Sequence, residues 1–132
     1  MSNTKFIPLS VPNIAGNEWK YVKDCLDTGW ISSVGSYVTQ FEQMVAEFAG
    51  ARYGVAAVNG TAALHISLLL SGVQQGDYVI LPNLTFVASA NSIKYLGAEP
   101  LLIDADPALW QMDLGLLEEF LGTQTTTEGN NL

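Results

Sequence analysis

Short apolar runs alternate with helical patterns along the middle of the chain, and this alternation constrains the fold most strongly. The apolar runs cover residues 53–58, 78–81 and 99–103, and helical patterns fill residues 61–72 and 86–96 between them. This spacing is typical of successive βαβ units, in which the strands lie parallel and helices cover the sheet. The predicted fold class is therefore α/β, a mainly parallel sheet with helices on both faces.

The helix that begins near Thr61 is apolar on nearly every side. Its large apolar residues are Leu64, Ile66, Leu68, Leu69 and Leu70. A helix of this kind is predicted to be buried between the sheet and other helices. Two helical patterns precede it, one carrying Trp19, Val22 and Leu26 and the other covering residues 37–49. Each of these is predicted to bury one apolar stripe.

The junction between the first apolar run and this helix has the sequence Asn59-Gly60-Thr61-Ala62. A strand that turns through glycine and small residues into a helix leaves several backbone N–H groups unpaired, with the positive end of the helix dipole behind them. Such a junction binds phosphate well. The junction lacks the lysine and serine of a P-loop and the three glycines of the dinucleotide fingerprint. These residues alone therefore predict a phosphate-bearing ligand of unspecified kind.

Two aromatic residues are candidates for ligand contact. Phe86 stands at a strand-to-helix junction, where it could stack on a planar ring or pack under its own helix. Thr85 beside it reads as a helix N-cap. Trp30, Ile31 and Ser32 open a loop of small residues that runs to Gly35, and this loop either touches a ligand or uses the tryptophan as an anchor on the core.

Other polar residues favour structural roles. His65, the single histidine, has no carboxylate or hydroxyl partner that the sequence places beside it, so a structural histidine is the preferred interpretation over a catalytic base. Asp104 and Asp106 could form a carboxylate pair, but Asp-Ala-Asp-Pro is ordinary turn chemistry and a turn is preferred. Cys25 is predicted to be a small buried residue of a reducing compartment. No metal site is predicted.

Charge and hydropathy narrow the classes of partner. Five Lys and Arg against thirteen Asp and Glu give a formal charge of −8, which argues against a nucleic-acid surface. The sequence contains neither an apolar run of membrane-spanning length nor a signal peptide, so we expect a cytoplasmic protein without a membrane partner. Residues 122–132 have no apolar periodicity and read as an irregular tail, which suggests that the chain is a truncated piece of a longer protein.

Several linked motifs give the chain a resemblance to the sugar-nucleotide aminotransferases of the DegT/DnrJ/StrS type. The resemblance extends from about Ile7 to Leu121. The motifs are Asn59-Gly60-Thr61-Ala62-Ala63-Leu64, Gly76-Asp77-Tyr78-Val79-Ile80, residues 81–91, residues 29–35, Gly97-Ala98-Glu99-Pro100 and Asp104-Ala105-Asp106.

The resemblance implies a pyridoxal 5'-phosphate (PLP) enzyme with the aspartate aminotransferase fold. Gly60, Thr61 and Ala62 would bind the cofactor phosphate, and Phe86 would stack on the pyridine ring in a position that often holds tryptophan or tyrosine. Trp30, Ile31 and Ser32 would contact the nucleotide-sugar substrate near a homodimer interface. Residues 1–36 would form an N-terminal segment, helix and active-site loop. Residues 37–121 would form the first part of the large PLP-binding domain, and residues 122–132 the tail.

The implied reaction converts a 3-keto or 4-keto nucleotide sugar to an amino sugar, with glutamate as the amino donor, for surface polysaccharide synthesis. The family's Schiff-base lysine and the acid that pairs with the pyridine nitrogen would lie beyond Leu132. No catalytic residue is therefore assigned, and we expect the 132-residue chain alone to be inactive. Two alternatives stay open: a PLP-dependent sugar dehydratase of the same family, which uses histidine in place of the lysine, and a non-catalytic binding or regulatory module.

Overall fold

The computed structural model describes residues 6–126, which divide into two compact units between Val55 and Ala56. The first unit contains helix α1 (Glu18–Thr28) and helix α2 (Ser36–Ala49). Both helices follow the predicted patterns. Each ends at a glycine with a left-handed backbone, Gly29 at φ 76° and Gly50 at φ 65°, a conformation that glycine adopts without strain.

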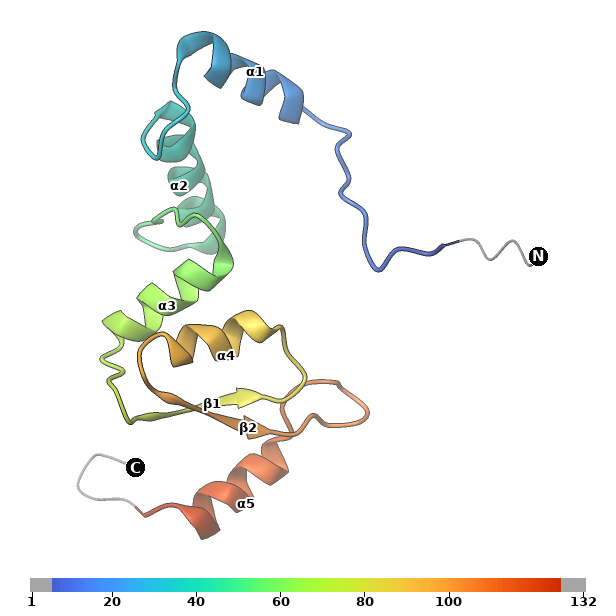
Figure 1. The fold of residues 1–132 in the computed structure, drawn as a ribbon, viewed down its shortest axis with the longest axis vertical. Coiled ribbons are helices and arrows are strands. Elements are labelled where there is room, and N and C mark those ends of the chain that lie inside the picture. The colour runs from blue at the N-terminus through green and yellow to red at the C-terminus, as the bar shows by residue number, and fades with distance from the viewer. Residues whose placement is uncertain (1–5, 127–132) are drawn as a thin grey trace. The chain divides into compact units, whose positions relative to one another are not determined.

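The second unit is a small α/β assembly (Figure 1). In chain order it contains α3 (Gly60–Leu70), β1 (Tyr78–Pro82), α4 (Val87–Lys94), β2 (Glu99–Ile103) and α5 (Leu114–Gln124). The last helix continues to Gln124, three residues into the segment 122–132 that was predicted to be an irregular tail. The predicted tail is therefore helical at its start, and residues 127–132 lie outside the described part of the chain.

Strands β1 and β2 are parallel, as predicted. Their register pairs Tyr78 with Glu99 and Pro82 with Ile103. One further hydrogen bond continues the ladder past the carboxyl ends of the strands, where Asn83 N–H donates to Ile103 O at 2.7 Å. Figure 1 shows α4 and α5 on opposite sides of this sheet. The α/β class with helices on both faces is thus confirmed.

The hydrophobic core of the second unit lies between α4 and the sheet. Leu81 of β1, Ile93 of α4 and Ala98 before β2 are buried and in contact with one another. The partly buried residues packed around them are Leu68, Val73, Val79 and Ala90. Because Leu68 belongs to α3 and Ala90 to α4, the same core holds the two helices together.

Two expectations about burial and pairing are wrong for the described residues. Residues 53–58, predicted as the first strand, form no strand in residues 6–126, where the sheet consists of β1 and β2 alone. A strand requires a neighbour that completes its hydrogen bonds, and neither edge of this sheet pairs with the segment. Helix α3, predicted to be buried, packs against α4 along one side only and leaves Leu70 81% exposed.

The apolar stripes of α1 and α2 are likewise not buried. Trp19 on α1 and Phe48 on α2 are both exposed, and neither helix holds a buried residue. Amphipathic periodicity identifies the face that a helix can bury, whereas burial itself depends on which other elements cover that face.

Candidate functional site

The first turn of α3 forms a group of backbone donors that we call the α3 cradle (Asn59, Gly60, Thr61 and Ala62). Asn59 is extended and its Oδ1 accepts a hydrogen bond from Ala62 N–H at 2.9 Å, while its carbonyl accepts from Ala63 N–H at 3.1 Å. Within residues 6–126, the N–H groups of Gly60 and Thr61 donate to no acceptor. These two donors stay available at the positive end of the helix dipole.

Space for a ligand lies beside these donors. A Cβ built on Gly60 would meet no atom within 4 Å, so the backbone of this residue can be approached closely. Ala62, in contrast, has already used its N–H on Asn59. Of the three residues predicted to bind the phosphate, Gly60 and Thr61 therefore keep free backbone donors and Ala62 does not.

Phe86 caps the N-terminus of α4 with an extended backbone, at φ −74° and ψ 138°. Its ring is 79% exposed, so it does not pack under its own helix. Thr85 is not the N-cap that the sequence suggested, because α4 begins one residue later and Phe86 occupies the N-cap position. The Oγ1 of Thr85 instead lies 3.3 Å from Ser89 Oγ. The exposed ring fits the predicted stacking role, which stays a prediction.

The α3 cradle and Phe86 lie at the same edge of the sheet. Helix α4 begins after the carboxyl end of β1, and α3 packs beside it with its N-terminus toward the same side (Figure 1). Ligands of open α/β sheets bind at the carboxyl edge of the strands. Residues 26 positions apart, Gly60 and Phe86, are thereby brought to one edge.

Ser92 of α4 connects the two helices. Its side chain is fully buried, and its Oγ lies 2.7 Å from Ala88 O in its own helix and 3.1 Å from Thr61 O in α3. The Ser92 carbonyl lies 3.4 Å from Nδ1 of His65, whose ring meets Tyr95 edge-on at 5.9 Å. These contacts support the structural interpretation of His65. Sequence reasoning missed Ser92, because a serine inside a short helix carries no signal that it faces another helix.

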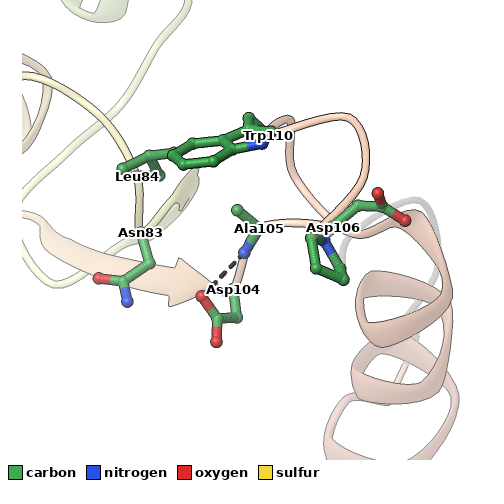
Figure 2. A pocket seen from close by; sticks show the side chains of 7 residues that line it. Asn83, Leu84, Asp104, Ala105, Asp106 and Trp110 are labelled. Carbon is green, nitrogen blue, oxygen red and sulfur yellow. Dashed lines mark hydrogen bonds between the residues drawn. The ribbon is translucent and has the colours of Figure 1, made fainter.

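A pocket of about 380 Å³ opens at the carboxyl ends of β1 and β2 (Figure 2). Its lining residues are Asn83, Leu84, Asp104, Ala105, Asp106, Pro107 and Trp110. Asp106 Oδ1 accepts hydrogen bonds from Ala108 N–H at 2.8 Å and Leu109 N–H at 2.7 Å, which confirms the predicted turn.

Trp110 closes this turn with a backbone φ of 60° and an exposed ring that lies beside Leu84 in Figure 2. A left-handed backbone is uncommon for a bulky residue. It is held here by the hydrogen bond from Trp110 N–H to Asp106 O at 2.8 Å. No sequence signal identified this conformation.

The loop predicted to contact substrate belongs to the first unit. Trp30 is 59% exposed and therefore does not anchor the loop on a core, and Ile31 is exposed as well. Trp30 and Ser32 help to line a smaller hollow of about 130 Å³ between the loop, α1 and α2. The hollow also includes half-buried Cys25 and Tyr37. The Tyr37 hydroxyl donates to Asp24 Oδ2 at 3.0 Å, and this hydrogen bond raises the pKa of Tyr37. The substrate-binding roles of Trp30, Ile31 and Ser32 stay predictions.

Lys94, the lysine of the second unit, does not join the α3 cradle. Lys94 lies in the last turn of α4, six residues beyond Ala88, and its Nζ pairs with Glu99 Oε1 at 2.6 Å. Lys20 and Lys23 lie on α1 in the first unit. Residues 6–126 contain no cluster of potential metal ligands and no helix long and apolar enough to cross a membrane.

Comparison with known proteins places this geometry in a family. The model of the DegT/DnrJ/EryC1/StrS aminotransferase family matches residues 12–127. The chain is 44% identical over 125 residues to the GDP-perosamine synthase of Caulobacter vibrioides, covering 95% of this chain and 34% of that protein. It is 45% identical over 121 residues to the GDP-perosamine synthase of Escherichia coli O157:H7, covering 92% of this chain and 33% of that protein.

Solved structures agree with the sequence relatives. Spr1654 from Streptococcus pneumoniae in its PLP form superposes with a TM-score of 0.77 at 34% identity, covering 86% of this chain and 29% of that chain. The chain thus spans about a third of the length of the relatives that it matches. Because the family model covers nearly the whole sequence, the chain belongs to the DegT/DnrJ/EryC1/StrS aminotransferase family.

Proposed function

We propose that this chain forms the part of a PLP-dependent aminotransferase that holds the cofactor phosphate and ring, and that the enzyme converts a keto nucleotide sugar to an amino sugar. The observation that carries the proposal is the pair of free N–H groups at Gly60 and Thr61 in the first turn of α3, together with an N-terminus of α4, preceded by the exposed Phe86, that lies on the same side of the sheet as that of α3 (Figure 1). The GDP-perosamine synthases among its relatives support the assignment to sugar amino transfer.

The donor set of the α3 cradle fits the phosphate of PLP. Its charge selectivity must come from local groups, because the chain as a whole carries −8 and repels anions at long range. Gly60 and Thr61 supply two backbone N–H donors and a side-chain hydroxyl, and the dipole of α3 adds a partial positive charge. Asn59 stabilises this turn without adding negative charge.

PLP, when bound, supplies an electron sink for the negative charge that develops during amino transfer. The residues of this chain contribute binding and orientation. Gly60 and Thr61 donate hydrogen bonds to the phosphate, and Phe86 presents a ring face for offset stacking. Holding the phosphate and the ring at two separate points fixes the orientation of the group and lowers the entropy cost of reaction.

The finer parts of the proposal follow the family. Glutamate is the proposed amino donor. The proposed contacts of the nucleotide sugar are Trp30, Ile31 and Ser32. The proposed form of the whole enzyme is a homodimer in the cytoplasm. The domain boundaries 1–36, 37–121 and 122–132 belong to the same proposal. The catalytic lysine is not assigned to any residue of this chain, so we propose that the 132-residue chain binds the cofactor without transferring amino groups.

A binding experiment tests the cofactor-holding role. Pyridoxamine 5'-phosphate (PMP) has no aldehyde and cannot react with surface lysines, so its affinity reports on non-covalent contacts alone. We expect the chain to bind PMP at least tenfold more tightly than pyridoxamine, which lacks the phosphate. Gly60→Val fills the open space at the α3 cradle and should abolish this preference. Gly122→Val, also at a glycine with no atom near its Cβ, is the matched control and should keep it.

Equal affinities for PMP and pyridoxamine in the parent chain would contradict the proposal. The reaction is tested separately with the complete enzyme, a GDP-linked 4-keto sugar and glutamate, with mass spectrometry of the product. An amino sugar supports the aminotransferase. A deoxy sugar without nitrogen would indicate the dehydratase instead, and no product with tight PMP binding would indicate a non-catalytic module.

A further inference from the structure

The geometry points to Ser92 as a positioning residue that fixes the α3 cradle relative to Phe86, an inference that rests on the proposed cofactor-holding function. The phosphate holder and the ring holder stand on different helices, α3 and α4. A ligand that contacts both at once requires a defined distance between the two helix N-termini. Ser92 is the residue whose polar contacts join those helices near the cradle.

Ser92 contacts α3 at two successive turns. Its Oγ lies 3.1 Å from Thr61 O, in the residue that carries a free N–H of the cradle, and its carbonyl lies 3.4 Å from His65 Nδ1 one turn later. Since a carbonyl oxygen only accepts, the second contact requires the proton of His65 on Nδ1. Two contacts one turn apart restrain both sliding and rotation of α3 against α4.

The side-chain contact is protected from water. Ser92 is fully buried, so its hydroxyl proton can be shared only between Ala88 O and Thr61 O, and no solvent molecule replaces either contact. Phe86 starts the helix whose first turns include Ala88. The hydroxyl therefore connects the first turn of α3 to the beginning of α4, which is the pair of segments that the proposed ligand spans.

Removal of this hydroxyl should affect a ligand that spans both helices more than a ligand that contacts one. In Ser92→Ala, α3 and α4 keep their shared apolar core but lose the hydrogen bond that sets their relative position. Binding of PMP must then order the two N-termini, a cost that preorganisation avoids in the parent. Inorganic phosphate, which requires the cradle alone, and pyridoxamine, which requires Phe86 alone, do not incur this cost.

The test compares three ligands with Ser92→Ala and a matched control. Ser67→Ala is the control, because Ser67 Oγ makes the same kind of bond to the carbonyl four residues earlier, at 2.8 Å, but makes no hydrogen bond to a second helix within residues 6–126. In Ser92→Ala, calorimetry and ³¹P NMR titration should show PMP affinity lowered about fivefold, the factor that one ordinary hydrogen bond is worth. Affinities for phosphate and pyridoxamine should stay within twofold, and Ser67→Ala should match the parent for all three ligands.

Each other outcome has a distinct meaning. Unchanged PMP affinity in Ser92→Ala, or an equal loss for PMP and inorganic phosphate, overturns the positioning role and leaves the cofactor site intact. A parent chain that binds PMP no better than pyridoxamine overturns the proposed function, and the positioning role with it. Ser92→Cys keeps a side-chain donor at this position, weaker than the hydroxyl and on a slightly larger side chain, and should show an intermediate PMP affinity, which carries the test if Ser92→Ala does not fold.

Discussion

Asn59 offers the sharpest test of the anion site, because its side chain affects both the stability of α3 and the charge beside the cradle. Its Oδ1 accepts from Ala62 N–H at 2.9 Å from an exposed position. Replacement by alanine removes this cap, whereas serine keeps a neutral cap and aspartate keeps a cap while adding a negative charge. The three variants therefore separate capping from electrostatics.

The magnitudes follow from the geometry. Loss of the cap in Asn59→Ala should lower the free energy of unfolding by about 1 kcal/mol, whereas Asn59→Ser and Asn59→Asp should stay near the parent. Two unit charges one helical turn apart, about 5.4 Å, repel by about 0.8 kcal/mol in water. A phosphate dianion doubles this value, so Asn59→Asp should bind PMP about tenfold more weakly at low salt. At 0.15 M salt, screening over a Debye length of about 8 Å reduces the loss to about fourfold.

The assay is a titration of each variant with PMP at two salt concentrations, together with chemical denaturation. Asn59→Ser should bind PMP like the parent, which makes it the control for a shortened side chain. An Asn59→Asp variant that keeps full PMP affinity at low salt would refute the placement of the phosphate at the N-terminus of α3. An Asn59→Ser variant that loses as much affinity as Asn59→Asp would show that the amide itself, and not charge, governs binding.

Two further predictions concern the first unit. A Cβ at Gly54 would lie 2.5 Å from the backbone oxygen of Glu42. Gly54→Ala should therefore lower the free energy of unfolding by about 2 kcal/mol in chemical denaturation. The control is Gly122→Ala on α5, where a Cβ meets open space, and it should raise the free energy of unfolding slightly in the same assay. The hydrogen bond to Asp24 raises the pKa of Tyr37 above 10.0 in the folded chain. Tyr37 therefore ionises at lower pH in the unfolded chain than in the folded one. The contribution of this hydrogen bond to stability is present below pH 10 and is lost as pH rises through the raised pKa. Tyr37→Phe should lack this alkaline loss in thermal melts from pH 8 to pH 11, and an identical pH profile would contradict the assignment.

The periodic elements could be predicted from the sequence because their signals are local. The patterns from residue 78 onward predicted β1, α4 and β2 to within about two residues at each end, and the pattern over residues 37–49 predicted α2 to within one residue. Such features depend on neighbours three or four positions away. The family resemblance added the cofactor and the proposed roles of Thr61 and Phe86, which generic spacing rules had left as an unspecified phosphate site.

The features that the sequence did not predict depend on distant partners. Residues 53–58 have the composition of a strand, but strand formation requires a neighbouring strand, which the described residues do not provide. The prediction that α3 is buried is wrong for the same reason, because composition indicates that a helix can be buried but not whether other elements pack against it. Ser92 and the left-handed backbone of Trp110 become visible only when contacts between elements are known.

The α3 cradle and Phe86 lie at one edge of the sheet because of the topology, and no unusual residue is required. In a parallel sheet every strand ends at the same edge, so the helix that follows a strand begins there, and α4 with Phe86 obeys this rule after β1. Helix α3 packs beside α4 in the same direction, which brings the cradle to that edge as well. Parallel topology determines the edge but not the spacing along it, because apolar side chains such as Leu68 and Ala90 allow small shifts between helices. A directional contact is needed for the spacing, and the buried hydroxyl of Ser92 between Ala88 O and Thr61 O provides one.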